Sequence, residues 1–265
     1  MKVTLITGAS GGIGEAFARK LAEEKHNLVL VARSEKKLHE LCDELMLKHK
    51  ITAHYVALDL NEFEADKRLF EETEKHEMEI EWLINNAGFG SMGDFARLEL
   101  ERELEMINLN ISALVALTHR YLQKMRERRS GTIINVASTA SFQPIPFMAT
   151  YAATKAFVRS FSEAIAGENR PFNINVSAFC PGPVDTGFFD AADIKSDVRS
   201  AMFKKGIQTP EEVVETAIAA AKSGKIKVIP GWKNYLLANF VNFVPESLIV
   251  RVMGTALRPK FEDKK

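Results

Sequence analysis

A tyrosine and a lysine four residues apart, Tyr151 and Lys155, could together transfer protons. The window around them, Ala149 to Ile165, is rich in Ala, Phe and Val and predicts a helix. Side chains at positions i and i+4 of a helix lie on one face, so the phenol and the ammonium would be neighbours. A free tyrosine has a pKa of about 10, and a neighbouring lysine cation lowers that pKa. The pair is therefore a candidate general acid or base, although an ordinary amphipathic helix can carry the same two residues.

A glycine-rich turn near the start of the chain could bind a phosphate group. Lys2 to Thr7 is a mostly β-branched run that predicts a strand, and the apolar stripe after residue 15 predicts a helix. Gly8, Gly12 and Gly14 lie between them. Glycines let the backbone turn sharply and approach a pyrophosphate, whose charge is favoured at a helix N-terminus. Strand, glycine turn and helix in this order predict a dinucleotide-binding site.

The end of the second predicted strand, Asn27 to Arg33, favours NADP over NAD. Folds that bind NAD commonly place an acidic residue here to hold the ribose 2′-hydroxyl. This chain has Ala32 and then Arg33. A guanidinium can bind a 2′-phosphate with two hydrogen bonds, whereas a carboxylate would repel it. The alternative is an arginine that is simply solvated at the end of a strand.

Strands and helices alternate along the whole chain. Further strands are predicted at 52–58, 80–85, 131–137, 173–179 and 226–230, with helical patterns between them. This order predicts an α/β, doubly wound Rossmann fold with a mostly parallel, seven-stranded sheet and helices on both faces. Ligands of such folds bind beyond the carboxyl ends of the strands. Gly14, Arg33, Asp59 and Gly88 all fall at such ends.

Composition excludes several other classes of protein. The 265 residues contain 35 basic and 35 acidic side chains, whereas a nucleic-acid binder usually carries a basic excess. No apolar run reaches the ~18 residues of a membrane span, and the glycine turn follows the first residue too closely for a signal peptide. Cys42 and Cys180 show no disulfide or metal-ligand pattern. We therefore expect a cytoplasmic protein with one Rossmann-fold domain over residues 1–265, no metal site and no nucleic-acid partner.

The sequence after Thr186 carries weaker patterns. Residues 187–208 have little periodicity and three phenylalanines, which favours a substrate lid over a surface excursion. Thr209 is the expected N-cap of a helix over 210–222. An apolar, aromatic extension covers about 232–265. It could cover the substrate site, pack against another subunit, or make a peripheral contact with a membrane surface.

Taken together, these residues resemble the short-chain dehydrogenase/reductase family, in the common branch marked by TGxxxGxG and YxxxK. The resemblance covers residues 3 to about 186. In chain order, the matching elements are Thr7-Gly8-x-x-x-Gly12-Ile13-Gly14, Asp59, Asn85-Asn86-Ala87-Gly88, Asn110, Ser138, Tyr151-x-x-x-Lys155, and Pro181-Gly182 with Thr186.

The resemblance implies catalytic roles for four residues. Tyr151 would donate the proton during carbonyl reduction. Lys155 would lower the pKa of Tyr151 and hold the nicotinamide ribose, and Ser138 would hydrogen-bond the substrate oxygen. Asn110, rather than Asn108, is similar to the family's asparagine that holds a relay water beside the lysine.

The resemblance also implies a set of cofactor contacts. Arg33 matches the position that selects NADP, and the Asp59-Leu60 pair is similar to the one that contacts the adenine. The other implied contacts, besides Tyr151 and Lys155, are Gly8, Ser10, Gly12, Ile13 and Gly14 at the pyrophosphate, Asn86, Ala87 and Gly88 beneath the adenosine ribose, and Pro181, Gly182, Val184 and Thr186 beside the nicotinamide.

The implied function is an NADP(H)-dependent oxidoreductase that exchanges a hydride with a carbonyl or alcohol. Phe142, Phe147, Phe188 and Phe189 would suit an apolar ketone, acyl or steroid-like substrate. Family members commonly pair through the helices that here begin near Asn110 and Tyr151, which implies a homodimer or homotetramer. The alternative is a catalytically idle nucleotide-binding or regulatory protein on the same fold.

Overall fold

The computed structural model describes residues 1–188, 207–258 and 261. In this part of the chain, seven strands form one sheet in the order β3-β2-β1-β4-β5-β6-β7, and every pairing is parallel. The strands are β1 (Lys2–Thr7), β2 (Leu28–Ala32), β3 (Ala53–Ala57), β4 (Glu79–Asn85), β5 (Gly131–Val136), β6 (Ile174–Phe179) and β7 (Lys227–Val228). The predicted seven-stranded α/β fold is therefore confirmed. The predicted lid at 187–208 lies almost wholly outside the described residues.

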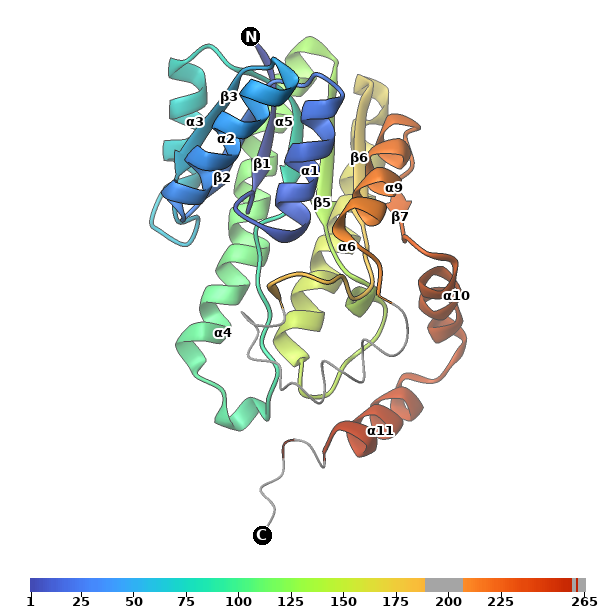
Figure 1. Cartoon of the computed structure of the whole chain (residues 1–265). Coiled ribbons are helices and arrows are strands. Elements are labelled where there is room, and N and C mark those ends of the chain that lie inside the picture. The colour runs from blue at the N-terminus through green and yellow to red at the C-terminus, as the bar shows by residue number, and fades with distance from the viewer. Residues whose placement is uncertain (189–206, 259–260, 262–265) are drawn as a thin grey trace.

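Helices cover both faces of the sheet (Figure 1). Each layer buries its own apolar cluster against the strands. One layer contains α1 (Gly12–Glu23), α2 (Glu35–His49) and α9 (Pro210–Lys222), and the other contains α3 (Ala65–Lys75), α5 (Leu114–Arg128) and α6 (Ala149–Asn169). All five residues of β2 are buried, as the unbroken apolar run of a central parallel strand requires.

One long predicted helix is interrupted. The pattern over residues 100–129 predicts a continuous helix, but the chain forms α4 (Leu100–Ile107), the π-helical segment η2 (Asn108–Ala113) and then α5. Single π turns inside helices occur frequently at functional sites. Here the wider turn coincides with Asn110, whose buried side chain hydrogen-bonds outside its own helix. Short 3₁₀ segments are η1 (Phe95–Arg97), η3 (Thr139–Phe142) and η4 (Arg170–Phe172).

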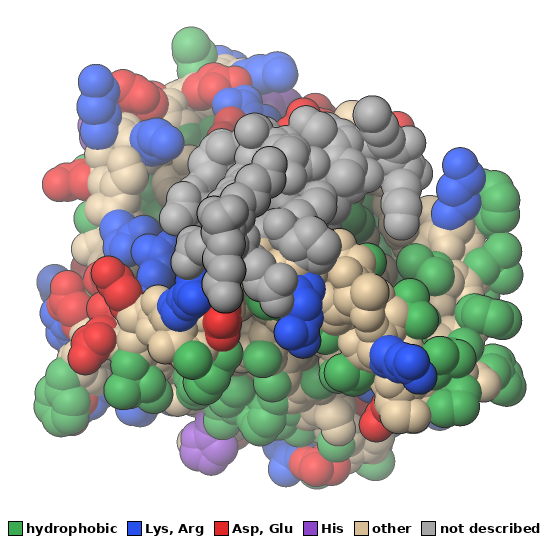
Figure 2. All heavy atoms as spheres, turned by 90° about the horizontal axis from the view of Figure 1, so that it is seen from below, with side chains coloured by type: hydrophobic (Ala, Val, Ile, Leu, Met, Phe, Trp, Pro, Cys, Tyr) green, Lys and Arg blue, Asp and Glu red, His purple; other side chains and the backbone are tan. Residues whose placement is uncertain are grey.

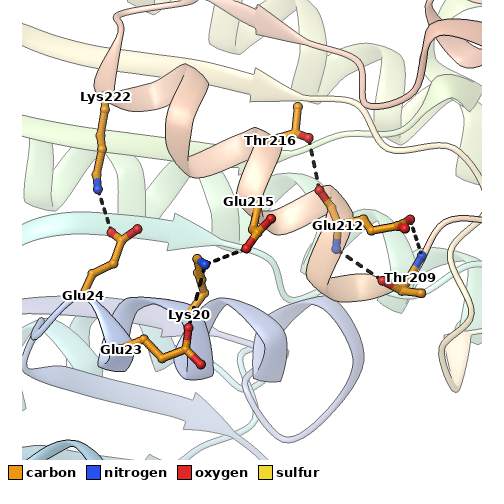
Figure 3. Close-up of polar contacts among 8 residues, drawn as sticks. All are labelled: Lys20, Glu23, Glu24, Thr209, Glu212, Glu215, Thr216 and Lys222. Atoms are coloured by element: carbon orange, nitrogen blue, oxygen red, sulfur yellow. Dashed lines mark hydrogen bonds and ion pairs between the residues drawn. The ribbon is translucent and has the colours of Figure 1, made fainter.

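Ion pairs join α1 and α9, which are far apart in sequence but adjacent in one helical layer (Figure 3). Thr209 caps α9 through a reciprocal capping box with Glu212, as its position before Pro210 predicts. Lys20 reaches Glu215 at 2.6 Å, and Lys222 reaches Glu24 at 2.7 Å. These ion pairs are partly exposed, so we expect their contribution to stability to be small.

The C-terminal extension forms two helices that stand away from the sheet at the lower right of Figure 1. They are α10 (Trp232–Phe240) and α11 (Glu246–Leu257), joined through the 3₁₀ segment η5 (Val241–Phe243). Among the described residues, none of the helices has the length and apolar character needed to cross a membrane.

Candidate active site

The candidate catalytic residues follow the ends of strands at the carboxyl edge of the sheet, which points downward in Figure 1. Tyr151 and Lys155 lie in the first two turns of α6 and are 8% and 6% exposed. The Lys155 Nζ donates to the Val136 carbonyl at the end of β5, at 2.7 Å. The same Nζ lies 5.9 Å from the centre of the Tyr151 ring. The helical spacing therefore places the two groups side by side, as predicted.

Burial dominates the protonation of both groups. It raises the pKa of Tyr151 to about 12, and a side-chain interaction with Ser138 offsets part of this increase. It lowers the pKa of Lys155 to about 8. The sequence predicts the opposite direction for Tyr151, because it places a lysine cation nearby but cannot show how much water the fold removes. At neutral pH the phenol consequently keeps its proton and is a donor.

The low pKa of Lys155 predicts a pH-dependent cost in stability. The free side chain has a pKa of 10.5, so the unfolded chain holds this proton more tightly than the folded chain. Below pH 8 the folded protein bears the full cost, roughly 3 kcal/mol, and the cost disappears as the pH rises from 8 to 10.5. We expect Lys155→Met to raise the free energy of unfolding at pH 7 by roughly 1 kcal/mol, because the variant removes this cost but also loses the charged hydrogen bond to Val136. Urea denaturation at pH 7 and pH 10 measures this change.

The matched control for this experiment is Lys36→Met, which removes a lysine that is 86% exposed. Its effect should be the same at both pH values. Equal effects of Lys155→Met at pH 7 and pH 10 would contradict the low pKa of Lys155.

Asn110 lies inside the site, and Asn108 does not. The Asn110 side chain donates to the Phe89 carbonyl and to Thr154 Oγ1, each at 3.0 Å, and accepts from the Phe89 amide at 3.2 Å. A Cβ on Gly88 would lie 2.7 Å from Asn110 Oδ1 and 3.6 Å from Lys155 Nζ. Asn110 therefore fixes the chain after β4 against α6. Asn108 instead donates to Asn61.

Ser138 follows β5 and caps the segment η3, where its Oγ accepts from the Ala140 amide at 3.1 Å. Among the phenylalanines proposed for substrate contact, Phe188 lies beside the candidate acid, with its ring centre 5.3 Å from that of Tyr151. Phe147 stacks on Phe261 at 4.7 Å, and Phe142 is buried in a separate apolar cluster. Phe189 lies outside the described residues.

The glycine turn is held against the end of β4. Asn86 Nδ2 donates to the carbonyls of Thr7 and Gly8, at 2.9 and 3.2 Å. Thr7 Oγ1 accepts from the amides of Asn86 and Ala87, each at 3.0 Å. A Cβ on Gly14 would collide with the Gly8 carbonyl and lie 2.6 Å from Asn86 Nδ2. The close approach of the two segments therefore requires glycine at this position.

Specific contacts place several of the other predicted cofactor residues. Arg33 is 80% exposed beyond β2, with its Nη1 3.8 Å from Asp59 Oδ2. Thr186 packs against Gly12, since a Cβ there would lie 3.1 Å from its methyl group. Three further predicted cofactor residues have apolar side chains. Val184 is buried in the same apolar cluster that Ile13 packs against, and Leu60 is buried in the cluster on the other face of the sheet.

Comparison with known proteins identifies the family. Residues 2–196 match the sequence profile described as short chain dehydrogenase, which is well over half of the chain. The chain belongs to the short-chain dehydrogenase/reductase family. It is therefore an NAD(P)-dependent oxidoreductase that acts on carbonyl or alcohol groups. The resemblance seen in its motifs is confirmed.

Relatives of this dehydrogenase act on several substrates. Ketoacyl reductase HetN of a Nostoc species is 32% identical over 229 residues, which are 86% of this chain and 78% of that protein. A 7beta-hydroxysteroid dehydrogenase of Mediterraneibacter gnavus is 31% identical over 231 residues, 87% of this chain and 86% of that protein. A solved short-chain dehydrogenase from Sphingobium yanoikuyae in complex with NADPH is 28% identical, with a TM-score of 0.83 over 94% of this chain and 95% of that one.

Two residues that the sequence analysis did not single out support the loop after β6. Gln208 pairs with Val184 in an isolated parallel bridge and accepts a hydrogen bond from Asn234 Nδ2 at 3.0 Å. Asn234 also lies against Gly182, where a Cβ would be 2.5 Å from its Nδ2. The start of α10 thus supports the loop that begins at Pro181. Neither residue belongs to a recognisable motif, so only the tertiary contact reveals it.

Proposed function

We propose that this dehydrogenase reduces a carbonyl group with NADPH, and that Tyr151 donates the proton. The observation that carries the proposal is the meeting of Tyr151, Lys155, Ser138 and Asn110 beneath the glycine turn. An idle protein on the same fold would have no reason to bury a lysine and a tyrosine here at a cost in solvation. The buried phenol keeps its proton at neutral pH, so it has a proton to donate.

The residues of the glycine turn fit a dinucleotide. The helix α1 has Gly11 at its N-cap and no side-chain hydrogen bond that caps it. Its first amides are thus free of side-chain partners and suit the charge of a pyrophosphate. A Cβ on Gly11 would meet nothing within 4 Å, so the turn is open on that side. Gly8, Ser10, Gly12, Ile13 and Gly14 would hold the pyrophosphate.

The remaining contacts follow from the placement of each residue. Leu60 would contact the adenine, and Asn86, Ala87 and Gly88 would lie along the adenosine side of the cofactor. Pro181, Gly182, Val184 and Thr186 would flank the nicotinamide. When bound, the nicotinamide supplies the hydride.

The chain's own residues would handle the substrate oxygen. Ser138 would hydrogen-bond that oxygen and orient it toward the Tyr151 hydroxyl. Lys155, held by the Val136 carbonyl, would place its positive charge where it stabilises the phenolate left after proton transfer. Asn110 would keep the chain at Gly88 in place beside the lysine.

Arg33 is the residue that we expect to select NADP. Its exposed guanidinium lies beyond β2, where Ala32 removes the usual carboxylate, and Asp59 lies close enough to orient it. Removing a charged hydrogen-bond partner costs ~1.5–3 kcal/mol, so we expect Arg33→Asp to weaken NADPH binding roughly 10- to 100-fold. Calorimetric titration of both proteins with NADPH measures this change.

NADH is the internal control for the same variant, because it lacks the 2′-phosphate. Its affinity should stay constant or increase. Equal weakening of both cofactors would show that Arg33 supports the fold rather than the 2′-phosphate, and tighter binding of NADH by the original protein would reject the NADP assignment.

The substrate class that we propose is an apolar carbonyl compound. Met92, Met106, Ala140, Met148 and Tyr151 form one buried cluster at the site, and Phe188 packs against it. The similarity to a ketoacyl reductase and a steroid dehydrogenase agrees with this choice. We also propose pairing of two copies through α5 and α6, the helices that begin near Asn110 and Tyr151; α6 exposes Phe157.

A further inference from the structure

The two C-terminal helices expose an extensive apolar surface. Seven large side chains in this part of the chain are each more than half exposed. They form what we call the C-terminal apolar surface: Trp232, Tyr235, Leu236, Leu237, Phe240, Phe243 and Val252. Figure 2 shows hydrophobic side chains along the right edge of the molecule, with Lys and Arg side chains among them. A concentration of exposed apolar side chains usually marks a binding face.

The orientation of α10 separates this surface from the core. Ala238 is the one buried residue among the nine of α10, and it packs in a cluster with Ala137 and Phe142. Trp232, Leu236 and Phe240 recur every four residues, so they form a stripe on the opposite side of the helix. None of the twelve residues of α11 is buried. Helices as apolar as these are normally covered in their working environment.

Charge is distributed unevenly between this extension and the rest of the chain. Residues 232–265 contain six basic and three acidic side chains, a net charge of +3, while the whole chain has a formal net charge of zero. Lys233 lies beside the Trp232 ring, with Nζ 5.7 Å from its centre, and Arg251 is exposed on α11. Apolar and cationic groups therefore occur on the same helices.

Two kinds of partner could cover such a surface. In a two-fold dimer the same patch meets itself, so pairing through α10 and α11, which carry two basic residues and one acidic residue, would bring two segments of net positive charge together. An anionic lipid surface instead complements the charge, because each Lys or Arg near it contributes about 1 kcal/mol. Exposed Trp and Phe together with Lys and Arg are typical of helices that lie in the membrane interface. The charge thus favours lipid over a second copy.

We propose that the C-terminal apolar surface docks this dehydrogenase onto an anionic lipid membrane. The helices α10 and α11 lie in the plane of the interface, with Trp232, Leu236 and Phe240 toward the acyl chains and Lys233 and Arg251 at the headgroups. This docking does not depend on the proposed reaction, because the surface is separate from Tyr151 and its neighbours.

Docking would place the membrane next to the candidate active site. Leu257, at the end of α11, packs against the apolar cluster that contains Tyr151. A Cβ on Gly254 would lie 3.8 Å from Pro146, in the loop before α6. A carbonyl compound dissolved in the bilayer would therefore have a short path to the site.

Sedimentation of the full chain with lipid vesicles tests the proposal. We expect vesicles of phosphatidylcholine with phosphatidylglycerol to bind the protein at least roughly tenfold more tightly than vesicles of phosphatidylcholine alone, and added salt to weaken this preference. The variant with Leu236→Glu and Phe240→Glu should lose binding to both. Lys233→Glu with Arg251→Glu should lose only the preference for anionic lipid.

The control is Phe63→Glu, which changes a side chain that is 88% exposed but lies far along the chain from these helices. It should bind vesicles like the original protein, and NADPH titration verifies that every variant is folded. Failure of the original protein to sediment with anionic vesicles would overturn the proposal. A dimer in light scattering that Leu236→Glu with Phe240→Glu dissociates, without vesicle binding, would show that a second copy covers the surface.

Discussion

Replacing Tyr151 with phenylalanine should lower kcat by about 10³-fold, because a positioned general acid contributes about 10²- to 10⁴-fold. The change removes one oxygen and leaves the ring, which packs in the apolar cluster at the site. It also removes a buried hydroxyl whose raised pKa keeps it protonated. NADPH affinity should change by less than about fivefold, the equivalent of one hydrogen bond. Turnover with a carbonyl substrate and calorimetric titration with NADPH measure the two effects separately.

Tyr121→Phe is the matched control for this prediction. Tyr121 is also buried, at 2% exposed, and its hydroxyl lies 3.1 Å from Thr73 Oγ1, within the layer of α3 and α5. Its loss should cost about 1 kcal/mol of stability and leave kcat unchanged. If Tyr151→Phe keeps its turnover, another group supplies the proton and the proposed mechanism is wrong. If it loses NADPH binding as well, Tyr151 acts in cofactor binding rather than in proton transfer.

Replacing Gly14 with alanine should abolish NADPH binding, with a loss of at least roughly 100-fold. The added methyl group would collide with the Gly8 carbonyl and with Asn86 Nδ2, and neither can move without breaking the contacts between the turn and β4. Overpacking of this kind typically costs ~1–3 kcal/mol, and the collision with backbone puts this site at the upper end. Calorimetric titration with NADPH and urea denaturation measure both losses.

We expect the opposite result from Gly167→Ala, which changes a helical glycine that has open space around it. Gly167 lies in α6, and a Cβ there would meet nothing within 4 Å. Alanine should therefore raise stability by up to about 1 kcal/mol, since it is the better helix former. If Gly14→Ala binds NADPH within a few-fold of the original protein, the turn can widen to accommodate the methyl group. That result would contradict the role that we assign to the close approach of Gly14 to Gly8.

The sequence alone was sufficient to predict the family and the layered fold. Strand and helix patterns are local, so the apolar run at Asn27 to Arg33 and the glycine turn at Gly8 to Gly14 could be recognised without coordinates. The capping box at Thr209 is equally local. The helical spacing of Tyr151 and Lys155 also fixed their common face, because the period of a helix does not depend on its surroundings.

Only the tertiary structure decided the electrostatics and the supporting contacts. The pKa of Tyr151 depends on how completely other segments exclude water, and burial raises it despite the interaction with Ser138. The π turn at Asn110 arises where that side chain hydrogen-bonds Phe89 and Thr154, which come from other segments. The exposure of α10 and α11 likewise depends on which helix face packs against the rest of the fold. These properties arise from contacts between distant segments, and residue type alone does not specify them.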